Sequence, residues 1–276
     1  GRAPLGYSLS VPRPARMGFW MAVSLVIGNM IGSGVFLLPS SLAAFGGFAL
    51  AAWLITAGGA ACLAFVFAHL ARANPAAGGL YAYTGRALGD LPGSLVAWGF
   101  WFSAWSAPAP LTLAGVGYLD PFIPGIVRTP ASAASLAIGM VWLFTLVNSA
   151  GVRAAGGVQV ATTVLKILPL VVIGIGGVLY FNAGAFALPV GTPPEAAASL
   201  SAAATLTLWA FLGLESGTIP AGSIEDPGRT IPRATVIGTL IAGAIYIVST
   251  VGVMSLLPAE TLATTTAPFG HRARPL

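Results

Sequence analysis

The residues best suited to bind a ligand lie inside long apolar runs. Between positions 26 and 36, glycines, an asparagine and a serine interrupt an apolar helical pattern, most densely at Gly32-Ser33-Gly34. Glycine inside a helix costs about 1 kcal/mol relative to alanine, so this cluster predicts local unwinding. Unwinding frees backbone N–H groups at one half-helix end, where an anion binds, and carbonyl groups at the other, where a cation binds. Together they suit a zwitterionic amino acid.

Two ionisable side chains lie inside other apolar runs. Glu215 stands between Gly213 and Gly217, and Lys166 lies about thirteen residues after Arg153, roughly 20 Å along a straight helix. An ionisable group deep in a membrane costs several kcal/mol unless it faces a cavity or a partner. We therefore expect Glu215 to act in gating or proton sensing. A carboxyl group hydrogen-bonded within the bundle, and a lysine that reaches the inner surface along a tilted helix, remain the plainer alternatives.

The composition places these runs in a membrane. Of 276 residues, 57% are hydrophobic and 7% are charged, whereas a soluble domain carries about 25% charged residues. This excludes an ordinary cytosolic enzyme, a disordered tail and a nucleic-acid-binding domain. The single cysteine, Cys62, lies in an apolar run. No residues have metal-ligand spacing or a catalytic arrangement, so we expect no metal, no cofactor and no enzyme.

The charged residues divide the chain into about seven transmembrane helices, since each needs about 20 apolar residues. Two lie between Arg16 and Arg72, with a turn at Phe45-Gly46-Gly47, and the others lie between Asp90 and Asp120, between Arg128 and Arg153, and near 157–181, 199–222 and 234–257. The sequence therefore predicts an all-α integral membrane protein.

Basic residues predict the orientation. With the N-terminus cytoplasmic, inner segments hold Arg2, Arg13, Arg16, Arg72, Arg86, Arg153, Arg229 and Arg233, and outer segments hold Arg128, Arg272 and Arg274. The positive-inside rule favours this arrangement in the inner (plasma) membrane. The basic tail, residues 271–276, would then lie outside, so we expect either that the chain stops early or that the tail is unrelated to the preceding helices.

The glycine-rich interruptions fall in the first and sixth predicted helices. Paired interruptions at matching positions are typical of transporters built from inverted repeats. We therefore predict a cytoplasmic segment over 1–16, a first five-helix repeat over 17–181, and the start of a second repeat over 182–270. The alternative is that Gly32 and Gly34 only allow close helix packing, and the spacing of Gly28 and Gly32 fits that pattern, but packing does not explain Glu215.

Four motifs carry a resemblance to a known family. They are Gly28-Asn29-Met30-Ile31-Gly32-Ser33-Gly34-Val35-Phe36-Leu37-Leu38-Pro39, Pro75-Ala76-Ala77-Gly78-Gly79-Leu80-Tyr81-Ala82-Tyr83, Trp209-Ala210-Phe211-Leu212-Gly213-Leu214-Glu215-Ser216 and Pro227-Gly228-Arg229-Thr230-Ile231-Pro232. In this order they resemble the amino acid–polyamine–organocation (APC) transporter superfamily, and in particular bacterial basic amino acid antiporters of the arginine/agmatine type.

The resemblance implies about twelve transmembrane helices, ten of them in two inverted repeats with broken helices 1 and 6. It implies transport of an amino acid, a cationic amino acid or a polyamine by alternating access, as an exchanger or a proton-coupled permease. With seven helices, the chain looks truncated, so a non-transporting fragment is the main alternative. A seven-helix receptor fits less well, because a retinal-type pigment carries its Schiff-base lysine on the last helix, which has none here.

The resemblance also assigns roles to individual residues. Ser33 and Gly34, beside Gly32, would bind the substrate carboxylate through backbone N–H groups and the Ser33 hydroxyl. The backbone carbonyls of Met30, Trp209 and Leu212 would bind the substrate ammonium, and the Trp209 ring would pack on the substrate side chain. Glu215 would gate, and Lys166 would stand where sodium sits in sodium-coupled relatives.

The third predicted helix departs from the antiporter pattern. Pro108 stands where those antiporters carry a pocket asparagine, so arginine specificity is not expected. Ser103, together with Ser106, would line the pocket instead. The partners implied are an amino acid or amine substrate and the lipid bilayer, without nucleic acid. Some relatives are dimers, so a homodimer is also among them.

Overall fold

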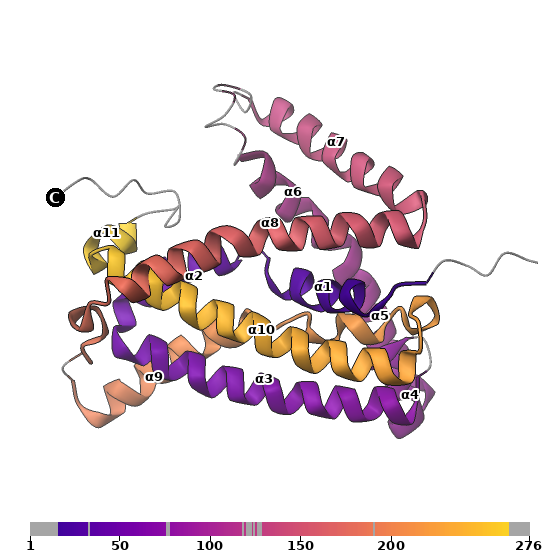
Figure 1. Ribbon diagram of the computed structural model, residues 1–276, viewed down its shortest axis with the longest axis horizontal. Coiled ribbons are helices and arrows are strands. Elements are labelled where there is room, and N and C mark those ends of the chain that lie inside the picture. Colours follow the sequence, from indigo (N-terminus) through magenta and orange to yellow (C-terminus); the bar gives the residue numbers. More distant parts are fainter. Residues whose placement is uncertain are drawn as a thin grey trace, which may run out of the picture.

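The computed structural model describes residues 16–32, 34–75, 78–117, 119, 123, 125, 129–189 and 191–264, and their regular elements are helices (Figure 1). The α-helices are α1 (Phe19–Met30), α2 (Gly34–Leu42), α3 (Gly47–Ala73), α4 (Gly79–Leu88), α5 (Asp90–Ser106), α6 (Pro108–Gly117), α7 (Pro130–Ser149), α8 (Val152–Leu179), α9 (Pro193–Trp209), α10 (Pro227–Leu256) and α11 (Ala259–Thr264). Short 3-10 helices are η1 (Ala43–Phe45), η2 (Ala183–Phe186), η3 (Leu214–Thr218) and η4 (Ala221–Ser223).

Five of these segments are long and apolar enough to cross a membrane. They are Gly47–Ala73, Pro130–Ser149, Val152–Leu179, Pro193–Thr218 and Pro227–Leu256. The other two predicted spans are each divided into two shorter helices. The first span is divided into α1 and α2, as the glycine cluster predicts, and the third into α5 and α6, which the sequence analysis did not predict.

The core forms where α1, α3, α8 and α10 lie side by side (Figure 1). Val26 of α1, Trp53 of α3, Leu170 of α8 and Tyr246 of α10 are all fully buried. Burial of large apolar side chains stabilises the packing of these helices through dispersion contacts. This core holds in place the two helices that the sequence predicts to be broken.

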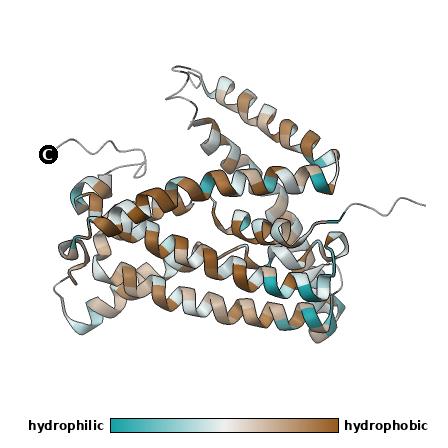
Figure 2. Ribbon diagram, viewed as in Figure 1, coloured by the Kyte–Doolittle hydropathy of each residue, from teal (hydrophilic) through white to brown (hydrophobic). Residues whose placement is uncertain are grey.

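The outward faces are strongly apolar, as Figure 2 shows along α3, α7 and α8. In the most apolar part of Pro130–Ser149 only 6% of the residues are buried, against 50% in Pro227–Leu256. Large side chains such as Trp98, Trp142 and Leu165 are exposed. In water such a surface would be an aggregation hazard, whereas in a bilayer it faces lipid tails, so the fold suits a membrane.

Glycines allow α8 and α10 to touch backbone to backbone. A Cβ atom added at Gly252 of α10 would lie 2.6 Å from the Cα of Gly174 on α8, and one added at Gly177 would overlap Gly252 itself. Small residues at membrane helix contacts allow this close approach. The contact fixes α10 against α8 along the core.

Candidate functional site: a cavity between two interrupted helices

The first interruption lies between α1 and α2. The last helical bond of α1 runs from Ile31 N to Ile27 O (2.7 Å), and the Gly32 N–H then turns back to the Met30 carbonyl (2.9 Å). Helix α2 begins at Gly34. Ser33, like the segment before residue 16 and the tail after residue 264, lies outside the described residues. The predicted break in this helix is confirmed.

The second interruption follows α9. That helix ends at Trp209, residues 210–213 form turns, and η3 begins at Leu214. Gly213 has a φ of 102°, in the left-handed region that favours glycine. A Cβ atom there would lie 3.1 Å from the carbonyl carbon of Asn29, near the end of α1. The sixth helix is therefore broken as predicted, and the two interruptions lie against each other.

An aromatic cluster supports the second interruption. The ring of Tyr246 lies 5.2 Å from that of Trp53 and 5.5 Å from that of Phe211, between ring centroids. Tyr246 Oη donates a hydrogen bond to the Ala210 carbonyl (3.0 Å). Because no main-chain N–H of the described residues donates to this carbonyl after α9 ends, the buried phenol satisfies a group that would otherwise be costly.

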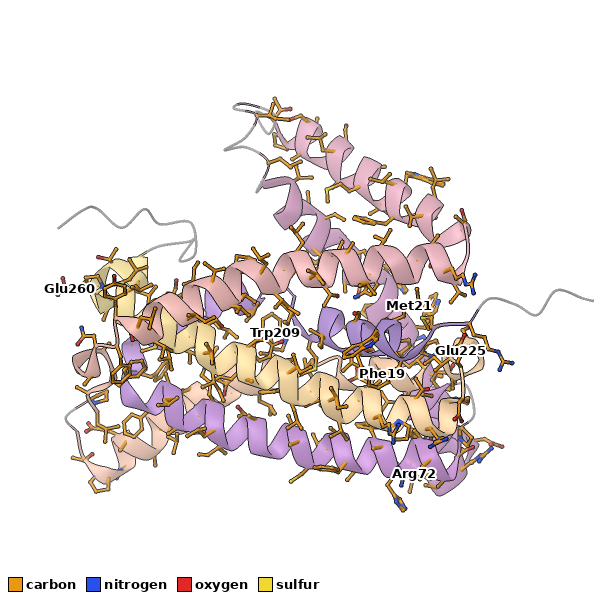
Figure 3. All side chains as sticks on the ribbon, in the orientation of Figure 1. Phe19, Met21, Arg72, Trp209, Glu225 and Glu260 are labelled. Carbon is orange, nitrogen blue, oxygen red and sulfur yellow. The ribbon has the colours of Figure 1, made fainter. Side chains whose placement is uncertain are left out.

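A cavity of about 570 Å³ opens beside both interruptions. Its wall combines residues of α1, α2, α5, α6 and the segment after α9: Asn29, Met30, Gly32, Val35, Phe100, Ser103, Ala104, Ala107, Pro108, Leu111, Trp209, Ala210, Leu212, Gly213, Glu215, Ser216 and Ile219. Figure 3 shows Trp209 near the middle of the molecule, far from its polar ends. The volume is within the usual range for small-molecule sites.

Six of the nine predicted site residues line this cavity. They are Met30, Gly32, Ser103, Trp209, Leu212 and Glu215. Gly34 is the first residue of α2, and Lys166 lies elsewhere, in the wall of another cavity. Ser106 lies outside the cavity wall, and its hydroxyl donates a hydrogen bond to the Ser103 carbonyl (3.4 Å). The carbonyls of Met30 and Trp209 each accept a local N–H, from Gly32 and Leu212 respectively.

Glu215 is half-buried in the cavity wall. Its Oε2 accepts a hydrogen bond from the Gly213 N–H (3.1 Å), one of the donors freed by the interruption. The side chain thus caps the broken helix and also places negative charge beside the cavity. The geometry fits both interpretations of Glu215, a role in gating or proton sensing and a carboxyl group hydrogen-bonded within the bundle.

Lys166 contacts the other side of α1. Its Nζ donates to the Gly28 carbonyl (3.3 Å), while Gln159 and Thr163 donate to the Ser24 carbonyl (3.3 and 3.2 Å). The three donors stand on one face of α8. Gly28 is four residues before Gly32, whose N–H bonds to Met30 instead. Lys166 therefore neutralises the carbonyl end of the α1 half-helix, where the helix dipole favours a cation.

The break in the third span was missed, although its signal is in the sequence. Pro108 and Pro110 have no N–H, so the carbonyls of Ala104 and Ser106 lose their helical partners. Ala104 lines the cavity, which gives the wall a third stretch of interrupted backbone. Phe100, one turn earlier, adds an aromatic ring that the sequence analysis also did not assign.

The family follows from comparison with known proteins. The amino acid permease family model matches residues 17–273, and the chain belongs to that family. The chain is 35% identical to the cadaverine/lysine antiporter of Escherichia coli K12 over 262 residues. These residues make up 94% of this chain and 58% of the antiporter. Identity is 34% to the putrescine transporter PotE of Haemophilus influenzae, over 92% of this chain and 59% of the relative.

These relatives are transporters, and none is named as an enzyme. A further match, the putrescine transporter PotE of Escherichia coli K12, is 32% identical over 95% of this chain. The chain spans about 60% of that protein. The family match, the helical fold and the apolar surface together place the chain in the APC superfamily, as the four motifs suggested.

Proposed function

We propose that the protein moves amino acids or polyamines across the inner membrane by alternating access, as an exchanger. The observation that carries this proposal is the cavity between the two interrupted helices, with Glu215 in its wall and Trp209 beside it. Substrate would bind here near mid-membrane, and rearrangement of the two broken helices would expose it to each side in turn. Cadaverine, lysine and putrescine are the candidate substrates, since relatives are named for them.

Each end of the substrate would bind a different part of the cavity. An α-carboxylate would bind N–H groups at the start of α2, around Ser33 and Gly34, where the helix dipole is positive. An ammonium would bind the Leu212 carbonyl, which accepts no hydrogen bond from another described residue. The exposed ring of Trp209 would stack on the alkyl chain and the cation.

A second ammonium would bind on the α5–α6 side of the cavity. Pro108 leaves the Ala104 carbonyl without its helical donor, and Ser103 adds a hydroxyl in the same turn. With the Glu215 carboxylate, this arrangement adds hydrogen-bond acceptors and a negative charge to the cavity wall. Diamines and lysine carry two ammonium groups, whereas a guanidinium finds no side-chain amide from this helix.

Lys166 would serve as a built-in cation. Sodium-coupled transporters hold Na⁺ with carbonyls freed at a half-helix end. Here the Lys166 ammonium bonds the Gly28 carbonyl, so a positive charge is already present. The proposed exchange therefore does not require Na⁺.

The repeat assignment and the orientation belong to the same proposal. Residues 17–181 would form the first repeat and 182–270 the start of the second, since each begins with an interrupted helix. The N-terminus would be cytoplasmic. Arg72 at the end of α3 and Arg233 near the start of α10 line one cavity and so share one end of the molecule, as the positive-inside rule requires.

Uptake into proteoliposomes tests the proposal. We would express the complete open reading frame, load vesicles with lysine, and measure entry of labelled cadaverine, putrescine and lysine. We expect uptake that requires internal substrate and is unchanged when K⁺ replaces Na⁺. The Trp209→Leu variant should raise KM at least tenfold, whereas Trp20→Leu, an exposed tryptophan outside the cavity, should leave KM unchanged. Equal kinetics for the two variants would exclude this cavity as the substrate site.

A further inference from the structure

A second cavity lies between the last turns of α3 and the first turns of α10. Its volume is about 410 Å³. Helix α3 contributes Phe65, Ala68, His69 and Arg72, and α10 contributes Pro232, Arg233, Val236 and Ile237. The α3 residues follow the spacing of a single helix face. Figure 3 shows Arg72 at the end of α3, beside the first turns of α10.

The cavity is positively charged at one end. Arg72 and Arg233 come from different helices, and His69 stands one turn before Arg72. Among the residues that the structure describes, no carboxylate lines it. Arg229, one turn before Arg233, lies 3.9 Å from Asp226, but neither the Arg72 side chain nor the Arg233 side chain has an ion pair or hydrogen bond to another residue that the structure describes. Two guanidinium groups are thus available to an anion.

The other end of the cavity is apolar and faces outward. Phe65 lies seven residues before Arg72, about 10 Å along the helix, and its side chain is 59% exposed. Ile237 lies one turn beyond Arg233 on the antiparallel helix α10 and is 38% exposed. Both helices are long and apolar enough to cross a membrane. The cavity therefore runs from cationic groups at a helix end to apolar groups toward the membrane interior.

We infer that this cavity binds the headgroup of an anionic phospholipid. Arginine forks match phosphate oxygens in paired hydrogen bonds. Basic pockets between transmembrane helices at the cytoplasmic side suit such lipids. The phosphate binds Arg72 and Arg233, with His69 at its edge, and the first acyl carbons pack along Phe65 and Ile237. A cavity with charged groups at one end and apolar side chains at the other matches a lipid better than a free anion.

The test uses the protein from its complete open reading frame, in detergent, and measures lipid binding rather than transport. Native mass spectrometry gives apparent dissociation constants for phosphatidylglycerol and for zwitterionic phosphatidylcholine. We expect the Arg72→Gln/Arg233→Gln variant to bind phosphatidylglycerol about 30-fold more weakly, since each basic group near a lipid surface contributes a factor of about five. Binding of phosphatidylcholine should change little.

Two further variants make the result decisive. Arg86→Gln/Arg153→Gln removes the same charge from exposed positions outside this cavity and should bind phosphatidylglycerol like the unchanged protein. Arg72→Lys/Arg233→Lys keeps the charge and should retain most of the affinity, which separates loss of the site from loss of the fold. An equal loss in the Arg86/Arg153 variant would overturn the inference, and so would equally tight binding of glycerol 3-phosphate, because the acyl contact would then contribute nothing.

Discussion

Tyr246 of α10 donates a hydrogen bond to the main-chain carbonyl of Ala210, across the core and 36 positions earlier in the chain, at 3.0 Å. The acceptor is in the first residue after α9 ends. The donor is buried between Trp53 and Phe211. A side chain of α10 thus satisfies the first carbonyl after α9, in the interruption to which we assign substrate binding.

Removing this phenol is expected to loosen the interruption. Tyr246→Phe keeps the ring but leaves the buried Ala210 carbonyl unsatisfied, at a cost of about 1–3 kcal/mol. We expect a lower melting temperature in detergent and weaker substrate binding. Tyr180→Phe, at the exposed end of α8, is the matched control and should change neither. An unchanged melting temperature in Tyr246→Phe would show that water or another donor replaces the phenol.

Glu215 contributes both a negative charge beside the cavity and a hydrogen bond to the Gly213 N–H, and one substitution separates the two effects. In Glu215→Gln the amide oxygen still accepts the Gly213 N–H, so the turn should persist and the melting temperature should change little. The negative charge beside the cavity is lost. A hydrogen bond to a charged group contributes about 1.5–3 kcal/mol, so diamine affinity should fall at least tenfold, as measured by equilibrium binding of labelled cadaverine. If affinity is kept while stability falls, the residue is only a cap.

Pro108 offers a test of the second ammonium site. Pro108→Ala supplies an N–H to the Ala104 carbonyl, which lines the cavity, and should join α5 to α6. We expect higher thermal stability together with weaker binding of cadaverine and putrescine. Pro110→Ala is the matched control, because it restores a partner to Ser106, which does not line the cavity. Equal effects of the two changes on diamine affinity would contradict a role for the Ala104 carbonyl.

Lys166 should be required for exchange. Lys166→Met removes the donor to the Gly28 carbonyl and the charge that faces the end of α1. We expect more than tenfold slower exchange in proteoliposomes, with partial recovery in Lys166→Arg, since the arginine restores the charge near the helix end. Full activity of the methionine variant would show that Gln159 and Thr163 alone position α1.

The glycine contact predicts a steric effect on stability. Gly252→Val places side-chain atoms against Gly174, where even a Cβ atom would lie 2.6 Å from its Cα. Overpacking a tight core costs about 1–3 kcal/mol, so thermal unfolding should occur at a clearly lower temperature. Gly176→Val, on the same helix as Gly174 but with open space around its Cβ position, should be tolerated. The comparison controls for glycine replacement within a helix.

The sequence predicts the elements of this fold better than their contacts. Charge spacing locates the spans, and the clusters around Gly32 and Gly213 locate the interruptions, because both depend on local residue types. The division of the third span has a local signal too, because Pro108 removes a helical N–H. The sequence analysis draws from Pro108 only the loss of a pocket asparagine. The hydrogen bonds from Tyr246 to Ala210 and from Lys166 to Gly28 join residues far apart in sequence. The spacing of residue types along the chain does not predict such pairs.

The backbone contact between α8 and α10 joins a helix before residue 181 to one after residue 182, the proposed boundary between repeats. The two segments are therefore not interchangeable parts. A chimaera that takes residues 182–270 from a relative will assemble only if that relative supplies an equally small residue opposite Gly174 and Gly177. For the same reason, the substitutions that α10 tolerates at this contact depend on the size of the side chains of α8, and the reverse also holds.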